Sequence, residues 1–517
     1  MFEKILIANR GEIACRIIKT CRKLGIKTVS VYSDADSQSK HVKLSDESYC
    51  LGQSDASSSY LNIEKILAAA KHHKVDAIHP GYGFLSENPE FAECCIKSGV
   101  CFIGPRPELI AQMGDKLAAR NLAQKAGLPI LPGTDEAVSD AQAVDEAWRL
   151  GFPLMVKAAD GGGGIGIHTI ESIDELIPIV DRTRKISESS FGSTRLFYER
   201  YLKDASHIEV QILGDQHGNL VHLHERDCSL QRRNQKVIEE TPSTKLSPEV
   251  QAKVHSLAIK LGKAINYTNA GTVEFLVTEQ GNIYFLEMNT RLQVEHGVTE
   301  LVTGLDLVEL QIKIAIGESL PIAQGDIAIR GHAIQARVYP EDPDTFMPNI
   351  GKVSGLHIPN CRSSRIDTAL CKGYEVTLHY EPLMAKVMAW GKNREESIKR
   401  LSKTLLALRI EGVKTNIPLL RDILTDQDFL DSIHHTGSLP KIIDAIILNR
   451  QSKKSNGSMD NKKQNNKELA ATIGVALAIA MNKSMSTSSS TEVDRSWRNV
   501  ARREQLLSRS TGRMDWH

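Results

Sequence analysis

The chain has 517 residues, 41% of them hydrophobic and 5% aromatic, enough for about three domains with cores of their own. Its formal net charge of +1 gives no reason to expect nucleic acid or an anionic membrane as a partner. Nine cysteines show no C-x-x-C or zinc-ligand spacing, which indicates free thiols in a reducing compartment. The N-terminus lacks the apolar core and cleavage site of a signal peptide, so we expect a cytoplasmic protein.

The N-terminal segment has the pattern of a βαβ unit. Residues 4–8 and 28–32 are short apolar strands, and residues 11–24 have helical spacing between them. Such a unit predicts a parallel, Rossmann-like sheet. The connecting turn, A-N-R-G-E, is not G-x-G-x-x-G, so a dinucleotide site is not expected.

A third strand, at residues 77–79, runs into the loop P-G-Y-G-F-L-S-E-N at residues 80–88. Ligands of open α/β folds bind at the carboxyl ends of the strands, where this loop lies. An aromatic residue in a glycine loop serves packing more often than binding. The pattern alone therefore leaves both roles open for Tyr82.

A second glycine-rich loop follows the apolar strand at residues 154–158. Residues 159–166 read A-D-G-G-G-G-I-G, and glycines let backbone N–H groups approach phosphate oxygens closely. No Lys-Ser or Lys-Thr pair follows, which excludes a Walker P-loop. From the pattern alone, a flexible surface loop is an equal alternative to a phosphate-binding loop.

Residues 272–289 form two alternating apolar runs around a Gln-Gly pair, the pattern of a β-hairpin. If the hairpin is symmetric about that pair, Glu274 lies opposite Glu287, with Asn289 on the same face. Opposed carboxylates repel each other, and two carboxylates with an amide oxygen are ligands that Mg²⁺ or Mn²⁺ prefers. The pattern predicts either a metal site or a solvated strand face screened by water and lysines.

The segment from the end of this hairpin onward carries the most specific signal. Residues 287–296 read E-M-N-T-R-L-Q-V-E-H, a motif that resembles the active-site segment of biotin carboxylases, a branch of the ATP-grasp superfamily. The similarity extends to about residue 449 and is strongest to the biotin carboxylase subunits of acyl-CoA carboxylases (acetyl- or propionyl-CoA type) and pyruvate carboxylases. It implies an α/β fold with three domains and an extra C-terminal tail. The implied limits are 1–113 for the Rossmann-like domain, 114–328 for the ATP-grasp domain with a lid at about 130–203, 329–449 for the β-rich domain and 450–517 for the tail.

The resemblance implies an ATP-dependent C–N ligase that carboxylates biotin. Bicarbonate would attack the γ-phosphate of ATP to give carboxyphosphate, with two Mg²⁺ or Mn²⁺ ions spreading the charge. Biotin would arrive on a separate biotin carboxyl carrier protein, and a carboxyltransferase subunit would pass the carboxyl group on to the final acceptor. The resemblance also implies a homodimer.

The resemblance assigns site residues by group. The catalytic group is Lys236, Arg291, Glu295 and Arg337. Bicarbonate would be held by Lys236, Arg291, Gln293, the Val294 backbone and Glu295, with Glu295 as the base. Biotin would meet Tyr82 and Arg337, and the metal ligands would be Glu274, Glu287 and Asn289. The ATP-binding group would be Lys116, Lys157, Gly162, Gly163, Gly164, Gly166, Glu199, Leu202, His207, Gln231, Asn234, Glu274 and Glu287.

The sequence departs from the family in the nucleotide site. Ile165 stands where Arg or Lys is usual, Ile167 replaces a usual Met, and Asn234 replaces a usual His. A well-formed charge-assisted contact to phosphate is worth about 1.5–3 kcal/mol. We therefore expect weaker ATP binding or altered lid closure, unless the nearby His168 supplies the missing cation.

The C-terminal segments look structural at first and then change in composition. A helix after residue 393 is expected to be capped by Asn393 and Glu396 in a capping box. Its buried positions should be Ile398, Leu401, Leu405 and Leu408. After residue 450 a polar linker is expected, followed by an apolar run at 469–481 that is about 20 Å long as a helix, too short for a membrane span. The tail is interpreted as a docking element for a partner subunit, with plain disorder as the alternative.

Two other functions compete with biotin carboxylation. One is another ATP-grasp carboxylate–amine ligase, against which the R-L-Q-V-E-H run and Arg337 argue. The other is a catalytically weak nucleotide-binding scaffold subunit, suggested by Ile165 and Asn234. The final carboxyl acceptor is a property of the carboxyltransferase.

Overall fold

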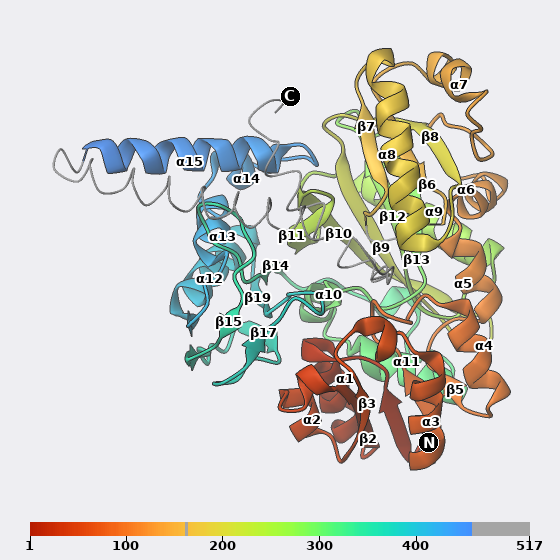
Figure 1. Ribbon diagram of the computed structural model, residues 1–517, viewed down its shortest axis with the longest axis vertical. Coiled ribbons are helices and arrows are strands. Elements are labelled where there is room, and N and C mark those ends of the chain that lie inside the picture. Colours follow the sequence, from red (N-terminus) through yellow and green to blue (C-terminus); the bar gives the residue numbers. More distant parts are fainter. Residues whose placement is uncertain (161–163, 457–517) are drawn as a thin grey trace, which may run out of the picture.

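The computed structural model describes residues 1–160 and 164–456, with side chains as far as residue 448 (Figure 1). Its N-terminal part is a five-stranded parallel sheet in the order β3-β2-β1-β4-β5. The strands are β1 (Lys4–Ile7), β2 (Lys27–Ser33), β3 (Glu47–Gly52), β4 (Ala77–His79) and β5 (Cys101–Phe102). The helices of this part are α1 (Gly11–Lys23), η1 (Asp34–Asp36), α2 (Lys40–Leu44), η2 (Ala56–Ser58), α3 (Ile63–His73), α4 (Pro89–Lys97) and α5 (Pro107–Gly114). The predicted βαβ unit is confirmed in β1, α1 and β2.

After Lys4 the first strand is apolar, because the N-terminal sheet is buried on both faces. Ile5 and Ile7 join a hydrophobic cluster with α1 and α11 (Leu307–Ile316), whereas Leu6 joins a second cluster with β2 and α3. Leu213 and Leu292 belong to the first cluster as well. The N-terminal sheet is thereby packed directly onto the segment that carries the hairpin.

An eight-stranded antiparallel sheet runs through the centre of the molecule in the order β13-β12-β9-β10-β11-β14-β19-β17. Its strands are β9 (Ser206–Gly214), β10 (Leu220–Arg232), β11 (Gln235–Thr241), β12 (Asn269–Val277), β13 (Ile283–Asn289), β14 (His332–Val338), β17 (Ser364–Thr368) and β19 (Ala385–Gly391). The pairing of β14 with β11 carries the sheet across the boundary expected between residues 328 and 329. The C-terminal strands are thus held by the same hydrogen-bond ladder as the strands that precede them.

A smaller three-stranded sheet, in the order β7-β6-β8, occupies the segment expected to form the lid. It comprises β6 (Leu154–Ala158), β7 (Ile167–Ile170) and β8 (Leu196–Arg200), with α7 (Ala143–Leu150) and α8 (Ile173–Phe191). This part of the chain has its own hydrophobic cluster, in which Leu154, Val156 and Leu176 pack with other residues of both helices. Figure 1 shows these elements together at one end of the molecule. The predicted strand at residues 154–158 is confirmed.

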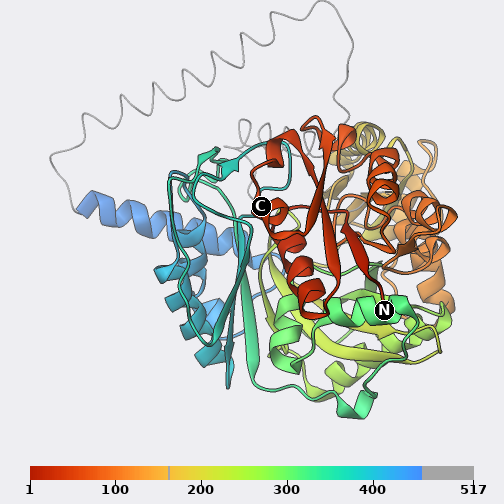
Figure 2. The same ribbon diagram turned by 90° about the horizontal axis from the view of Figure 1, so that it is seen from below.

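The other elements connect these sheets and complete the C-terminal part. Those before β14 are α6 (Lys116–Lys125), α9 (Pro248–Ala264), α10 (His296–Thr303) and η3 (Gln324–Asp326). Those after it are β15 (Gly351–Lys352), β16 (Gly355–His357), β18 (Glu375–Val376), α12 (Arg394–Ala407), β20 (Arg409–Glu411), α13 (Ile417–Ile423), α14 (Gln427–Leu430) and α15 (Ser438–Asn456). Figure 2 shows the C-terminal strands beside the N-terminal sheet.

The hairpin of β12 and β13 pairs Glu274 with Glu287, as predicted, but not through the symmetric turn that we assumed. Near the turn Val277 lies opposite Ile283, and the register shifts by one residue between Phe275 and Glu274. A β-bulge of this kind places an extra residue on one strand. The expected pair therefore forms because the bulge compensates for a pairing near the turn that is offset by one residue from the expected register.

Helix α12 is confirmed, with one change at its cap. The Asn393 side chain accepts a hydrogen bond from the Glu396 N–H, and Ile398, Leu401 and Leu405 are buried. Leu408, directly after the helix, is buried as well. The reciprocal bond of the predicted capping box is absent in this cap, because Glu396 accepts from the N–H of Lys392 and not from that of Asn393.

Helix α15 corrects the expected start of the polar linker. Residues 450–456, predicted to be linker, continue this helix, which projects from the body of the molecule in Figure 1. Its first half is anchored by buried Leu439 and Ile442, so the following polar residues extend an existing helix, which is easier than starting one. The predicted tail beyond residue 456, with its apolar run at 469–481, lies outside the described residues. None of the described helices combines the length and apolar character that a bilayer span requires.

Candidate active site

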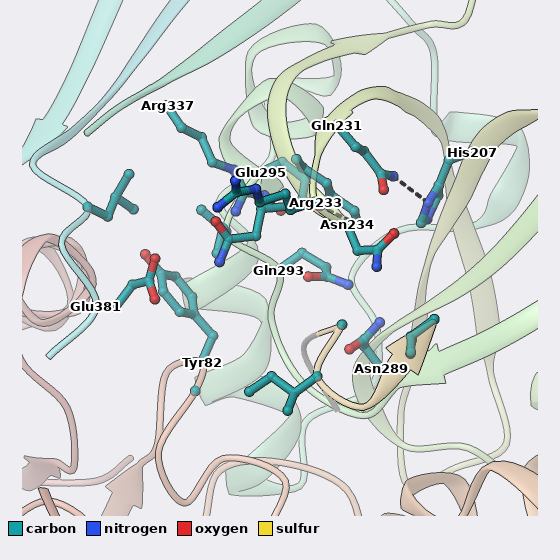
Figure 3. Close-up of a pocket in the computed structure, with 18 of the residues that line it drawn as sticks. Tyr82, His207, Gln231, Arg233, Asn234, Asn289, Gln293, Glu295, Arg337 and Glu381 are labelled. Atoms are coloured by element: carbon teal, nitrogen blue, oxygen red, sulfur yellow. Dashed lines mark hydrogen bonds and ion pairs between the residues drawn. The ribbon is translucent and has the colours of Figure 1, made fainter. Parts of the chain in front are cut away.

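A cavity of about 570 Å³ lies between the N-terminal loops, the lid and the central sheet (Figure 3). It brings together all the predicted site residues that the structure describes, with the single exception of Gly166. Gly162 and Gly163 lie outside the described residues. Gly166 packs against Ala158, and its carbonyl accepts the N–H of that residue. The cavity therefore collects residues that are distributed along the chain from Asn9 to Pro440.

Lys236 stands at the centre of the charged end of the cavity. Its ammonium lies 2.5 Å from Glu209, 3.1 Å from Glu274 and 2.8 Å from Glu295. Burial would lower the pKa of Lys236, but the three carboxylates raise that pKa well above its usual value. One permanent positive charge therefore holds together three acidic side chains that would otherwise repel one another.

Glu295 is fully buried directly before α10, between two cations. Its carboxylate accepts a hydrogen bond from Lys236 and another, of 3.0 Å, from Arg337. Burial raises the pKa of Glu295, but Lys236, Arg337 and Arg226 hold that pKa well below its usual range. The side chain is consequently ionised at neutral pH, which is the state that a general base needs.

Arg337, on β14, reaches the cavity beside Glu295. Its Nε donates to Glu239 over 2.5 Å, and its pKa is raised well above the usual value by Glu239 and Glu295 although burial opposes this. Tyr82 lines the same cavity, and the Lys386 ammonium lies 5.6 Å from the centre of its ring. The predicted biotin-facing pair thus shares the cavity with the predicted base.

Arg291 is held in place by four neighbours. Its Nε donates to Glu87 over 2.7 Å, and its other nitrogens donate to Gln293 over 2.9 Å and to Asn289 over 2.8 Å. A further bond reaches the carbonyl of Leu292. Glu87 belongs to the glycine loop after β4, so this ion pair ties the N-terminal domain to the motif after the hairpin.

The face that carries Glu274 is not a solvated surface. Glu274 is buried, and its oxygens accept hydrogen bonds from Lys236, from His207 over 2.6 Å and from two side-chain amides. His207 in turn contacts Gln231 over 2.7 Å, a bond drawn in Figure 3. Burial raises the pKa of Glu274, but Lys236 and His207 lower it well below the usual range. A lysine and a histidine therefore meet this charge instead of water.

The predicted metal ligands have the donor chemistry that a divalent cation needs. Glu274 and Glu287 face each other across the hairpin, and Asn289 bonds to Glu274 over 2.7 Å on the same face. Glu287 is the more open of the two carboxylates, with a third of its side chain exposed and Lys116 at 3.9 Å. Carboxylate and amide oxygens suit Mg²⁺. A cation at Glu274 would replace hydrogen-bond donors that this carboxylate has in the structure.

The lid side of the cavity contains a buried ion pair. The Lys157 ammonium bonds to Glu199, and Arg120 holds the same carboxylate over 2.8 Å. Leu202 lines the cavity next to this pair. Lys157 and Glu199 both belong to the predicted ATP-binding group, and here they are bonded to each other. For Lys157 to contact a phosphate, it must share its charge between Glu199 and the nucleotide.

The positions that depart from the family lie next to one another. Ile165 lines the cavity, and a Cβ added at Gly164 would lie 3.0 Å from that of Asn234. Asn234 has a φ of +60°, a conformation that asparagine tolerates better than most residues. His168 does not replace the missing cation, because it bonds to Thr183 and burial lowers its pKa to about 4. A neutral histidine supplies no charge at pH 7.

Replacing Ile165 by arginine should strengthen ATP binding. A restored cation facing the phosphates adds a charge-assisted contact of about 1.5 kcal/mol or more, which corresponds to a roughly tenfold lower KM for ATP. Steady-state kinetics at saturating bicarbonate and biotin measure this value, and Ile165→Gln serves as the uncharged control. An unchanged KM in the arginine variant, or an equal drop in both variants, would show that charge at residue 165 is irrelevant to the nucleotide.

Several residues of the site were missed from the sequence. Glu87, Glu209 and Glu239 each position a predicted residue, and Arg226 is fully buried against Glu209. Arg233 lines the cavity next to Asn234. A usable signal existed for Glu209, which stands between Ile208 and Val210 in β9, because a charge among apolar neighbours is costly without a partner.

Family models match three consecutive parts of the chain. These are "Biotin carboxylase, N-terminal domain" at residues 1–110, "Carbamoyl-phosphate synthase L chain, ATP binding domain" at 115–323 and "Biotin carboxylase C-terminal domain" at 335–441. The biotin carboxylase models at both ends show that the competing prediction of another ATP-grasp ligase is wrong.

Similar proteins support the same assignment. Biotin carboxylase 2 of Bacillus subtilis is 51% identical over 421 residues, covering 81% of this chain and 95% of that protein. The mitochondrial propionyl-CoA carboxylase alpha chain of Sus scrofa is 47% identical over 448 residues, 85% of this chain and 61% of that protein. A crystal structure of the biotin carboxylase domain dimer of Hydrogenobacter thermophilus 2-oxoglutarate carboxylase, with MgADP, ADP and bicarbonate, has a TM-score of 0.83 at 44% identity and covers 86% of this chain and 99% of that one. The chain therefore belongs to the biotin carboxylase family of ATP-dependent ligases.

Proposed function

We propose that this chain carboxylates biotin with ATP and bicarbonate, as the first half-reaction of a biotin-dependent carboxylase. The observation that carries the proposal is the position of Glu295, an ionised and fully buried carboxylate between Lys236 and Arg337 in the 570 Å³ cavity. A base, two cations and a nucleotide-sized cavity are what acyl-phosphate formation from bicarbonate requires.

In this proposal Glu295 becomes a stronger base when bicarbonate arrives. In the structure Lys236 and Arg337 direct their charges at Glu295, which lowers its pKa. A bicarbonate bound beside Lys236 interacts with the same ammonium, so Lys236 stabilises the ionised form of Glu295 less. The basicity of Glu295 then rises at the moment at which a proton is to be taken.

Arg291 and Gln293 supply the other contacts to bicarbonate. The guanidinium of Arg291 is fixed by Glu87 and by Gln293, so it is oriented before the substrate binds. Preorganised donors need no rearrangement during the reaction, which is where much of their catalytic effect originates. The Val294 backbone lines the same part of the cavity.

The nucleotide end of the cavity needs cations for the polyphosphate. Lys116 and Lys157 line it, and Glu274, Glu287 and Asn289 would hold Mg²⁺ or Mn²⁺. When bound, the ions would neutralise charge on the phosphoryl oxygens. His207 and Gln231 orient Glu274 from behind, as the partners of metal ligands do.

Biotin would enter between Tyr82 and Arg337. Glu239 and Glu295 both bond to the Arg337 guanidinium, and Arg337 lines the cavity. A cation at this place stabilises the negative charge that develops on the ureido oxygen when biotin loses a proton. The ammonium of Lys386 lies over the ring of Tyr82, 5.6 Å from its centre.

Biotin reaches this site on a separate carrier protein, and a carboxyltransferase subunit takes the product. The sequence contains no Met-Lys-Met motif that could accept biotin. The nearest approximation, A-M-N-K at residues 480–483, lies outside the described residues. The near-complete coverage of a biotin carboxylase from Bacillus subtilis supports a subunit of this type. The dimeric state of a similar solved domain supports a homodimer.

The test uses labelled bicarbonate. The purified chain with ATP, Mg²⁺ and free biotin should release ADP only when both bicarbonate and biotin are present. With a biotinylated carrier domain, the label should appear on the carrier alone, and treatment with biotin ligase should leave the mass of this chain unchanged. Bicarbonate-independent ADP release would refute the reaction. A biotin adduct on any lysine of this chain would refute the separate carrier and leave the reaction intact.

A further inference from the structure

Three histidines cluster outside the active-site cavity, where β10 packs against α9. His222 and His224 belong to β10 and His255 to α9, and one ring nitrogen of each lies within 4.8 Å of the others. The rings of His222 and His255 stack with their centres 4.3 Å apart. None of the three lines the cavity, and seven residues of strand, roughly 23 Å, separate His224 from Gln231.

A β-bulge directs this part of β10. The register with β9 shifts between His222 and Glu225, and His224 has a φ of +63°. A non-glycine residue adopts this left-handed conformation rarely, and keeps it only where surrounding contacts hold it. Bulges re-aim side chains that a regular strand would place elsewhere. The irregular backbone thus helps to set the positions of the His222 and His224 side chains.

Hydrogen bonds prepare two of the rings for a metal ion. His255 uses Nε2 to bond to the buried Glu225 over 2.5 Å, and His224 uses Nε2 to bond to the Ile327 carbonyl over 3.4 Å. Both bonds place the proton on Nε2 and leave the lone pair on Nδ1. A carboxylate or carbonyl behind the imidazole is the usual second partner of a metal-bound histidine. On binding a metal ion through Nδ1, His222 would give up the 3.4 Å contact that this nitrogen accepts from the backbone N–H of His224.

We propose that His222, His224 and His255 bind a Zn²⁺ ion, with water as the fourth ligand. Zinc–nitrogen bonds of about 2.0–2.1 Å in a tetrahedron place the nitrogens about 3.4 Å apart. Nitrogens that lie within 4.8 Å of one another therefore have to approach by at most about 1.4 Å. Side-chain torsions allow such a movement. Three imidazoles favour zinc over Mg²⁺ or Ca²⁺, which prefer oxygen ligands.

The site would act as a clamp between three segments. It joins β10 to α9, and the Gln324 side chain bonds to both backbone groups of His222. Gln324 and Ile327 belong to the connection that leads into β14, the strand of Arg337. Metal binding here therefore stabilises the junction between the ATP-binding segment and the C-terminal strands.

The experiment measures Zn²⁺ binding by the full-length chain. After chelator treatment the protein is saturated with MgADP, which covers the second histidine-containing cluster, His207 with Glu209 and Glu274, in the active site. Zn²⁺ is then titrated by calorimetry, and Co²⁺ serves as a probe whose visible absorption reports tetrahedral geometry. We expect one Zn²⁺ per chain, a tetrahedral Co²⁺ spectrum and a higher unfolding temperature with Zn²⁺.

Matched variants decide the ligands. His255→Gln should weaken Zn²⁺ binding at least 100-fold and abolish the tetrahedral Co²⁺ spectrum, and Glu225→Gln should weaken binding about 10- to 100-fold. His357→Gln, an exposed histidine on β16, should change nothing. Unchanged MgADP binding verifies that each variant is folded. Failure of the parent chain to bind Zn²⁺, or equal binding by His255→Gln, would overturn the proposal and leave the histidines as a packing cluster.

Discussion

Glu295→Gln should lower kcat for bicarbonate-dependent ADP formation by about 10²- to 10⁴-fold, the range expected for loss of a general base. The amide is nearly the same size as the carboxylate, so the cavity keeps its shape. It cannot accept a proton, and it leaves Lys236 and Arg337 without the anion that they share. The KM for ATP should change little, because Glu295 lies at the bicarbonate end of the site. Steady-state kinetics with free biotin provide both values.

Glu240→Gln is the matched control for this variant. Glu240 is also a buried carboxylate, its oxygens accept from Arg394 over 2.7 and 3.2 Å, and it does not line the cavity. It should lose stability to a similar degree but keep its kcat. Comparable losses of kcat in the two variants would mean that Glu295 affects turnover only by stabilising the fold. Near-normal turnover by Glu295→Gln would remove it as the base.

Lys236→Met should have two large effects. Removing the ammonium from three carboxylates costs about 3–5 kcal/mol of stability, as expected when one partner of a buried ion pair is removed. It also removes a bicarbonate contact, and kcat should fall by more than about 100-fold. Methionine keeps most of the side-chain volume, so packing is a minor contribution. Urea unfolding and ADP release measure the two effects.

The pH dependence of this variant gives a signed test. In the parent chain Lys236 lowers the pKa of Glu295 and Glu274, so their stabilisation is present above their unfolded pKa of about 4.3 and is lost as the pH falls below it. Without Lys236, burial raises these pKa values. The destabilisation should therefore be largest at neutral and alkaline pH and shrink towards pH 5, and residual activity should rise with pH.

Lys245→Met is the control for Lys236→Met. Lys245 is a largely buried lysine whose ammonium lies 2.9 Å from buried Asp227, and it does not line the cavity. This variant should be destabilised without a large loss of kcat. If both lysine variants lose stability and activity equally, the charge of Lys236 has no special role. A destabilisation of Lys236→Met that does not depend on pH would contradict the proposed coupling to the carboxylates.

Local structure followed from the pattern of the chain. The apolar run at residues 154–158, the Asn393 cap and the alternation around Glu274 each led to the element that the structure contains. Such features depend on neighbouring residues and on side-chain periodicity. The bulge in the hairpin and the extension of α15 were missed, because each is a response to packing elsewhere and not to its own sequence.

The candidate site was predictable where a continuous motif carried it. Arg291, Gln293 and Glu295 lie within five residues, and their types indicate an anion site with a base. Their partners were not predictable. Glu87 reaches Arg291 from a loop, and Glu239 reaches Arg337 from a neighbouring strand. These residues are distant in sequence, and a single sequence holds no record of such contacts.

The sequence by itself therefore determined the strands, the helices and the chemical types present in the active-site motif. Only the tertiary structure decided which charges meet. Glu209 and Glu274 reach Lys236 because of the order of the strands in the sheet. Strands β9 and β12 lie on one side of β10, and β11, which carries Lys236, lies on its other side. Burial then determines how much each contact matters. Removing a charge from water costs free energy, and that cost is offset only when a partner of opposite charge is in contact.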